Sequence, residues 1–182
     1  MSYAQFLDDL RAFRTCWIGG RMRGGKTSLA YATAMSLSDR YGYQISGNIP
    51  SVFRRTSVLL QHAVIVFDEL GVMDVTPTRL QMALGKLDLV LLYPSAQRPH
   101  KDMCKMTARL VARPNEVLPW LCPYELWQVE FPDLGRRSTY YMLASGQSAW
   151  GVYDSGAMPV DDGGMTVELR RSVDRIATGW RV

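Results

Sequence analysis

Residues 20–27 read Gly20-Arg21-Met22-Arg23-Gly24-Gly25-Lys26-Thr27, which satisfies the pattern G-x-x-x-x-G-K-[ST] in full. The glycines allow a tight loop whose backbone N–H groups point inward at phosphate oxygens. An apolar run over 15–18 precedes the loop, and a helix expected over 26–41 brings its positive N-terminal end to it. The stretch therefore predicts a phosphate-binding loop between a strand and a helix.

In this loop Lys26 would reach the β- and γ-phosphates of ATP, and Thr27 would offer its hydroxyl to Mg²⁺. Arg21 and Arg23 occupy variable positions, where they touch nucleotide or lie in solvent. A glycine-rich turn without function is the alternative, but at about 7% glycine a chance match is roughly a one-in-a-hundred event. The expected nucleotide-binding residues are Gly20, Arg21, Met22, Arg23, Gly24, Gly25, Lys26, Thr27 and Ser28.

A second motif places two acids after the apolar run 63–67. Open parallel sheets bind ligands at the carboxyl ends of their strands, so Asp68 would hold Mg²⁺ through water and Glu69 would act as general base. The alternative is an ordinary strand end. Asp68 follows Lys26 by 42 positions, which leaves room for a helix, an extra strand and a short helix. We expect the loop and the acids to meet across adjacent strands.

A third motif follows the apolar strand expected over 88–93. Ser95 or Gln97 would sense the γ-phosphate or orient the attacking water, and Arg98 would act as an arginine finger in a neighbouring subunit. Arg109 and Arg113 are the other finger candidates. For each of these residues the alternative is a polar loop residue.

The pattern predicts an α/β fold with a central, mostly parallel sheet flanked by helices. Within one domain, 1–182, we expect an N-terminal helix (1–14), a nucleotide-binding core (15–113), appended strands (114–156) and a C-terminal tail or helix (157–182). Antiparallel hairpins are expected beyond Pro114. The further expected elements are strands at 43–49, 110–112, 126–131, 139–144 and 150–153, and helices at 57–61, from 76–77, at 102–108 and at 167–177.

Composition indicates a globular protein with phosphate-rich partners. The net charge is +4, and only four of the 21 basic residues are lysines. Arginine binds phosphates bidentately, although codon bias would explain the excess equally well. No apolar stretch is long enough to span a bilayer and no signal pattern opens the chain, so we expect a cytoplasmic protein. The three cysteines, widely spaced, are expected to be buried thiols.

With these motifs in order, the chain resembles the HerA/FtsK superfamily of DNA-pumping ATPases. It is most similar to the small genome-packaging ATPases of phages and of tailless, membrane-containing viruses, and it also resembles the zonula-occludens-toxin-like assembly ATPases of filamentous phages. The resemblance covers roughly residues 14–156. It rests on 20–27, 47–49, 64–69, 95–99 and the Tyr153-Asp154-Ser155 element.

The resemblance implies a RecA-like fold of the additional-strand, catalytic-glutamate (ASCE) class that uses Mg-ATP. It also implies a homo-oligomeric ring of roughly five or six subunits, pushing double-stranded DNA of any sequence into a preformed capsid. Capsid vertex or portal proteins would be partners, in the host cytoplasm and at the packaging vertex of the virion. No C-terminal nuclease is recognised, and the absence of a membrane segment favours packaging over membrane-bound assembly.

Several alternatives stay open. They are a zonula-occludens-toxin-like assembly or export ATPase, a nucleotide switch or small-molecule kinase, a non-enzymatic capsid protein and a helicase loader. The DNA-contacting residues are equally open. The basic candidates are Arg54, Arg55, Lys101, Lys105, Arg136, Arg137, Arg170, Arg171 and Arg175.

Overall fold

The computed structural model describes residues 3–20, 25–47, 61–67, 77–96, 98–99, 104–112, 124–131 and 137–144, and each structural statement below concerns this part of the chain. Its helices are α1 (Tyr3–Phe13), α2 (Lys26–Tyr41) and α3 (Pro77–Lys86). Its strands are β1 (Thr15–Gly19), β2 (Gln44–Gly47), β3 (Ala63–Val66), β4 (Leu89–Pro94), β5 (Met106–Ala112), β6 (Tyr124–Phe131) and β7 (Arg137–Ala144).

The strands form one seven-stranded sheet in the order β2-β3-β4-β1-β5-β6-β7. Strands β1 to β5 run parallel, whereas β6 pairs antiparallel with both β5 and β7. The predicted α/β class, with a mostly parallel sheet and antiparallel C-terminal strands, is therefore confirmed.

The expected adjacency of the two motif-bearing strands is wrong. Strand β4 lies between β1, which leads into residues 20–27, and β3, which leads into Asp68 and Glu69. Neighbouring strands are about 4.8 Å apart, so β1 and β3 are separated by roughly 10 Å. Both strands still end at the same edge of the sheet, because they are parallel.

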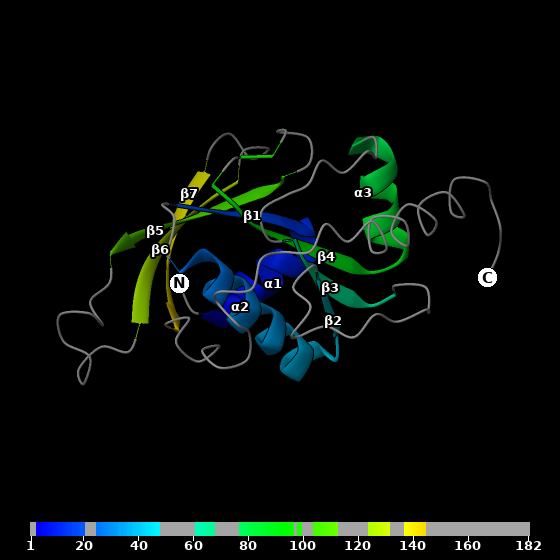
Figure 1. Cartoon of the computed structure of the whole chain (residues 1–182), viewed down its shortest axis with the longest axis horizontal. Helices are drawn as coiled ribbons and strands as arrows, with labels where there is room; N and C mark the ends of the chain where they lie inside the picture. The colour runs from blue at the N-terminus through cyan, green and yellow to red at the C-terminus, as the bar shows by residue number, and fades with distance from the viewer. Residues whose placement is uncertain are drawn as a thin grey trace.

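The helices cover opposite faces of this sheet (Figure 1). From β1 the chain crosses through α2 to the edge strand β2, and from β3 it returns in the other direction through α3 to β4. Because parallel crossovers are right-handed, opposite directions of travel place α2 and α3 on opposite faces. The core under α1 and α2 includes Leu10, Ile18, Leu37, Val64, Leu92 and Trp127. The core under α3 includes Trp17, Ile65, Leu84, Leu91 and Tyr93.

One predicted element has the wrong type. A helix was expected over 102–108, but β5 begins at Met106. Met106 and Ala108 pack into the core under α1 and α2, and the strand pairs along β1. The Lys105 N–H donates to Thr15 Oγ1 at 2.9 Å, and this bond aligns the start of β5 with the start of β1. Pairing with a distant strand thus overrides the local preference of the segment.

Some expected elements lie outside the described residues and stay predictions. These are the helices at 57–61 and 167–177, the strand at 150–153 and the Tyr153-Asp154-Ser155 element. Cys16 and Cys104 are free, buried thiols as expected, and Cys122 lies outside the described residues. Among the described helices, none is long and apolar enough to cross a membrane.

The central position of β4 gives a first prediction. Leu91 is fully buried there, opposite Ile65 of β3 and Thr15 of β1. We expect Leu91→Ala to lower the free energy of unfolding by about 2–5 kcal/mol, because the cavity would open between three strands. Urea unfolding measures this value. Met82→Ala is the control, since Met82 is 45% exposed on α3 and should change stability by less than about 0.5 kcal/mol. If Leu91→Ala and Met82→Ala lowered the free energy of unfolding equally, the central position of β4 in the sheet would be contradicted.

Candidate functional site at the carboxyl edge of the sheet

Two glycines bound the predicted phosphate loop. Gly20 follows β1 with φ 156°, and Gly25 precedes α2 with φ 76°. Side-chain-bearing residues rarely adopt such angles, so glycine is favoured at both ends of the loop. Arg21, Met22, Arg23 and Gly24 lie outside the described residues.

Lys26 is the first residue of α2 and folds back over the start of the loop. A Cβ placed on Gly20 would lie 3.8 Å from Lys26 Cγ and 3.9 Å from Lys26 Cδ. The lysine is only 6% exposed, which is rare for this residue type. Ser28 is buried and Thr27 half-buried in the same first turn. The positive end of the α2 dipole lies at this turn, and it favours a negatively charged group there.

The strand that carries the acid pair ends at the same edge of the sheet. Phe67 extends β3 by one residue: its N–H donates to Leu92 O at 2.9 Å, and its ring stacks on Tyr93 with centroids 6.2 Å apart. Asp68 and Glu69 come directly after Phe67 but lie outside the described residues. The structure therefore fixes the position of β3, which precedes the acid pair. The distance from Asp68 and Glu69 to Lys26 stays a prediction.

The end of β4 is tied to β1 through an indole. Trp17 Nε1 donates to both Ser95 O at 3.2 Å and Ser95 Oγ at 3.3 Å. Ser95, one of the two predicted sensors, is buried and bonded in this way. Gln97, the other, lies outside the described residues. The indole thus fixes where the chain leaves β4, immediately beside the loop that leaves β1.

Two of the three predicted finger arginines converge on the same indole. The guanidinium carbon of Arg98 is 5.8 Å from the Trp17 ring centroid, and that of Arg109 is 5.5 Å away. Both arginines are exposed. Cation–π attraction and stacking hold a guanidinium over an indole while its donors remain accessible. Arg113 lies outside the described residues.

Beneath these arginines lies Cys104, which is chemically inert. Its Sγ accepts from the Trp17 N–H at 3.2 Å and donates to Met106 O at 2.7 Å. Burial raises the pKa of the thiol to about 12, although the Trp17 hydrogen bond and the charge of Arg98 act in the opposite direction. A thiol that stays protonated is no nucleophile, so Cys104 contributes packing and hydrogen bonds at this edge.

Sequence reasoning missed Trp17 and Gly19. Both lie on the same face of β1, two positions apart, and a Cβ on Gly19 would approach two atoms of the indole to 2.5 Å. A glycine two residues from a large aromatic within a short strand is the signal that would have indicated this packing.

No protein-family model matches the chain, and comparison with curated proteins finds no relative. Any functional reading therefore depends on the motifs and on the site geometry.

The close packing of Gly19 gives the second prediction. We expect Gly19→Ala to lower the free energy of unfolding by about 1–3 kcal/mol, because the buried, hydrogen-bonded indole would have to move. Thermal unfolding followed by circular dichroism measures the loss. Gly85→Ala in α3 is the matched control: nothing lies within 4 Å of its Cβ position, and alanine favours a helix by up to about 1 kcal/mol. If Gly19→Ala were as stable as Gly85→Ala, the predicted clash would be absent.

Proposed function

We propose that this chain is a RecA-like ASCE P-loop ATPase. In this proposal it hydrolyses Mg-ATP and translocates double-stranded DNA as a ring of identical subunits, packaging a viral genome into a preformed capsid. The observation that carries the proposal is the strand order at the carboxyl edge. The loop at 20–27 leaves β1, the acids at 68–69 follow β3, and the two parallel strands end at the same edge with β4 between them.

The order of the strands also produces a topological switch point at this edge. The connection after β1 moves toward β2, whereas the connection after β4 moves toward β5 on the other side of β1. Adjacent strands whose connections leave in opposite directions form a topological switch point, where open α/β sheets bind ligands. The proposed triphosphate therefore lies where Gly20, Lys26 and the end of β4 come together.

The residues at the loop fit a magnesium-bound nucleotide. Glycine at positions 20 and 25 leaves the backbone open to phosphate oxygens, and Lys26 supplies a positive charge. When bound, Mg²⁺ neutralises charge on the phosphates; Thr27 and Asp68 would hold it. Glu69 would take the proton of the attacking water, and Gln97 would orient that water.

A neighbouring subunit would complete the site. Arg98 is exposed just past the end of β4, and its guanidinium, presented to the next subunit, would stabilise charge on the phosphoryl group transferred there. Arg109 lies over the same indole and shares this role as a candidate. The closeness of Arg98 and Arg109 means that one surface serves as the proposed subunit interface.

Contacts with DNA in this proposal are directed at the phosphates and indifferent to sequence. The arginine-rich composition supports such contacts. Of the basic candidates, Lys105 is half-buried at the entry to β5, and Arg137 begins β7. Arg54, Arg55, Lys101, Arg136, Arg170, Arg171 and Arg175 lie outside the described residues.

The catalytic proposal gives the third prediction. We expect Lys26→Ala to abolish ATP binding, because the charge opposite the phosphates is lost. Glu69→Gln should retain ATP binding but lower kcat by about 10²–10⁴-fold, because the general base is lost. Binding is measured with a fluorescent ATP analogue, and turnover by phosphate release. Lys86→Ala is the matched control, since Lys86 is exposed at the far end of α3 and should behave as wild type.

Adding duplex DNA separates the motor from its rivals. Phosphate release should rise with duplexes of unrelated sequence and fall again at high salt. A nucleotide switch or a small-molecule kinase would ignore DNA. A non-enzymatic capsid protein would release no phosphate under any of these conditions, which would end the proposal.

The trans arginine gives the fourth prediction. We expect Arg98→Ala mixed with Lys26→Ala, each inactive alone, to regain ATPase activity, because some sites in a mixed ring combine an intact Lys26 with an intact Arg98 from the neighbouring subunit. Steady-state ATPase activity across the mixing series measures this. Glu69→Gln mixed with Lys26→Ala is the control and should stay inactive, because both residues act within one subunit. If Arg98→Ala and Lys26→Ala fail to complement each other, Arg98 does not act in the neighbouring site, and Arg109 and Arg113 remain as candidates.

A further inference from the structure

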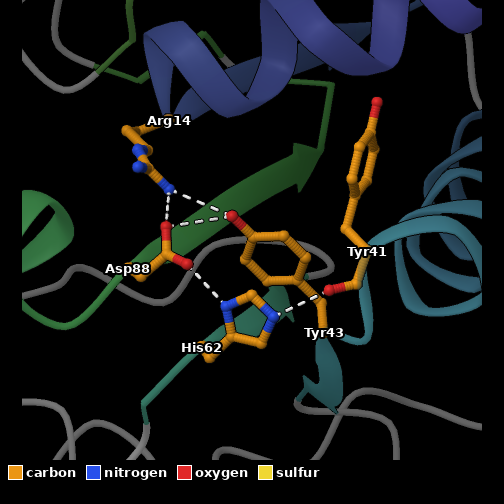
Figure 2. A network of polar contacts seen from close by, with 5 residues as sticks. All are labelled: Arg14, Tyr41, Tyr43, His62 and Asp88. Atoms are coloured by element: carbon orange, nitrogen blue, oxygen red, sulfur yellow. Dashed lines mark hydrogen bonds and ion pairs between the residues drawn. The ribbon is translucent and has the colours of Figure 1, made fainter.

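A polar cluster joins the opposite, amino-terminal edge of the sheet (Figure 2). Arg14, Tyr43, His62 and Asp88 directly precede β1, β2, β3 and β4. The Arg14 guanidinium forms an ion pair with Asp88 Oδ1 and donates to the Tyr43 hydroxyl at 3.1 Å. That hydroxyl donates to Asp88 Oδ1 at 3.0 Å. The Asp88 carboxylate thus links the residues that precede four neighbouring strands.

His62 extends the cluster to the end of α2. Its Nδ1 lies 2.5 Å from Asp88 Oδ2, and its Nε2 lies 2.9 Å from the carbonyl oxygen of Tyr41, the last residue of α2. The ring stacks on Tyr43 with centroids 4.1 Å apart. Its backbone is held from both sides: the His62 N–H donates to Leu87 O, and the His62 carbonyl accepts from the Gln44 N–H.

The two partners of the ring fix its charge. A backbone carbonyl and an ionised carboxylate can only accept hydrogen bonds, so both ring nitrogens must carry a proton. The carboxylate is ionised: burial would raise the pKa of Asp88, but hydrogen bonds from His62, Arg14 and Tyr43 together lower it below its ordinary value. His62 is therefore an imidazolium in this arrangement.

The surroundings of His62 agree with this charge. The hydrogen bond to the Tyr41 carbonyl raises the pKa of the ring most, and the bond to Asp88 adds to it, whereas burial and the charge of Arg11 in α1 act in the opposite direction. Tyr43 contacts the ring face, and Arg14 reaches it only through Asp88. The net effect raises the pKa of His62 above its ordinary value. Histidine is the side chain that changes charge near neutral pH.

We propose that protonated His62 is a pH-sensitive latch that holds the C-terminal end of α2 to the amino-terminal edge of the sheet. Loss of one proton leaves a single ring N–H. That N–H stays with the Asp88 carboxylate, since a charged acceptor makes the stronger hydrogen bond. The lone pair on Nε2 then faces the Tyr41 carbonyl, and this contact opens. Raising the pH thus releases the end of α2 while the rest of the cluster stays in place.

The charge of His62 is tested by NMR titration of the wild-type chain. The sequence contains two histidines, so His100→Gln assigns the His62 resonance and serves as the matched control. We expect the His62 midpoint to lie above about 6.5, the ordinary histidine value, and Asp88→Asn to lower it. A wild-type midpoint at or below about 6.5 overturns the latch. The wild-type measurement decides alone if Asp88→Asn does not fold.

The release of α2 is tested by amide hydrogen exchange of residues 38–44, corrected for the intrinsic pH dependence of exchange. In wild type the Gly42 N–H, which donates to Ser38 O at 2.8 Å, should lose protection as the pH rises through the His62 midpoint. His62→Gln should show low protection at every pH. Protection in wild type that stays constant between about pH 6 and pH 9 overturns the proposal.

The pH dependence of the free energy of unfolding gives a third test of the latch. Because the pKa of His62 is higher in the folded chain than in the unfolded chain, its stabilisation is complete below about pH 6.5 and is lost as the pH rises through the folded-state value. The difference in urea midpoint between wild type and His62→Gln should therefore shrink with rising pH. A difference that grows or stays constant overturns the latch.

Discussion

The structure depends on the placement of β1 between two parallel strands that come from elsewhere in the chain. Strand β1 pairs with β4 on one side and with β5 on the other. The chain must therefore leave β1 in one direction and return past it in the other. Because β1 lies beyond β4, the β1-to-β2 crossover runs opposite to the β3-to-β4 crossover, and this places α2 and α3 on opposite faces. The placement of β1 also creates the switch point at which the loop after β1 and the loop after β4 lie side by side.

The two edges of the sheet use different residues at their positive-φ positions. At the carboxyl edge, the glycines at positions 20 and 25 take positive φ angles of 156° and 76°, and the Trp17–Ser95 hydrogen bonds fix the chain next to them. At the amino edge, Arg14, His62 and Asp88 take positive φ angles of 67°, 47° and 51° despite their side chains. Each such residue costs about 1–2 kcal/mol, so the ion pairs and hydrogen bonds among these side chains offset strain in the turns that start the strands.

Sequence patterns predicted the parts of this fold that are local. The glycine-rich segment at 20–27 predicted a connection from a strand to a helix, which β1 and α2 confirm, and the unbroken apolar run at 63–67 predicted the buried parallel strand β3. The pairing of strands is not local, so the insertion of β4 between β1 and β3 was missed. The segment from Met106 was assigned to a helix for the same reason, since its partner in β1 is some 90 positions earlier. The Arg14–Asp88 ion pair is equally invisible in the sequence, because 74 positions separate the two residues.

Helix α2 connects the two edges. It begins at Lys26, beside the loop, and ends at Tyr41, whose carbonyl meets His62. Its buried residues run from Lys26 to Leu37, whereas the last turn, 38–41, is partly exposed. The first part of the helix is therefore fixed by packing, and its end depends more on polar contacts such as the one between Tyr41 O and His62. In the two proposals above, the proton on His62 and the phosphates of the nucleotide would act on opposite ends of this one helix.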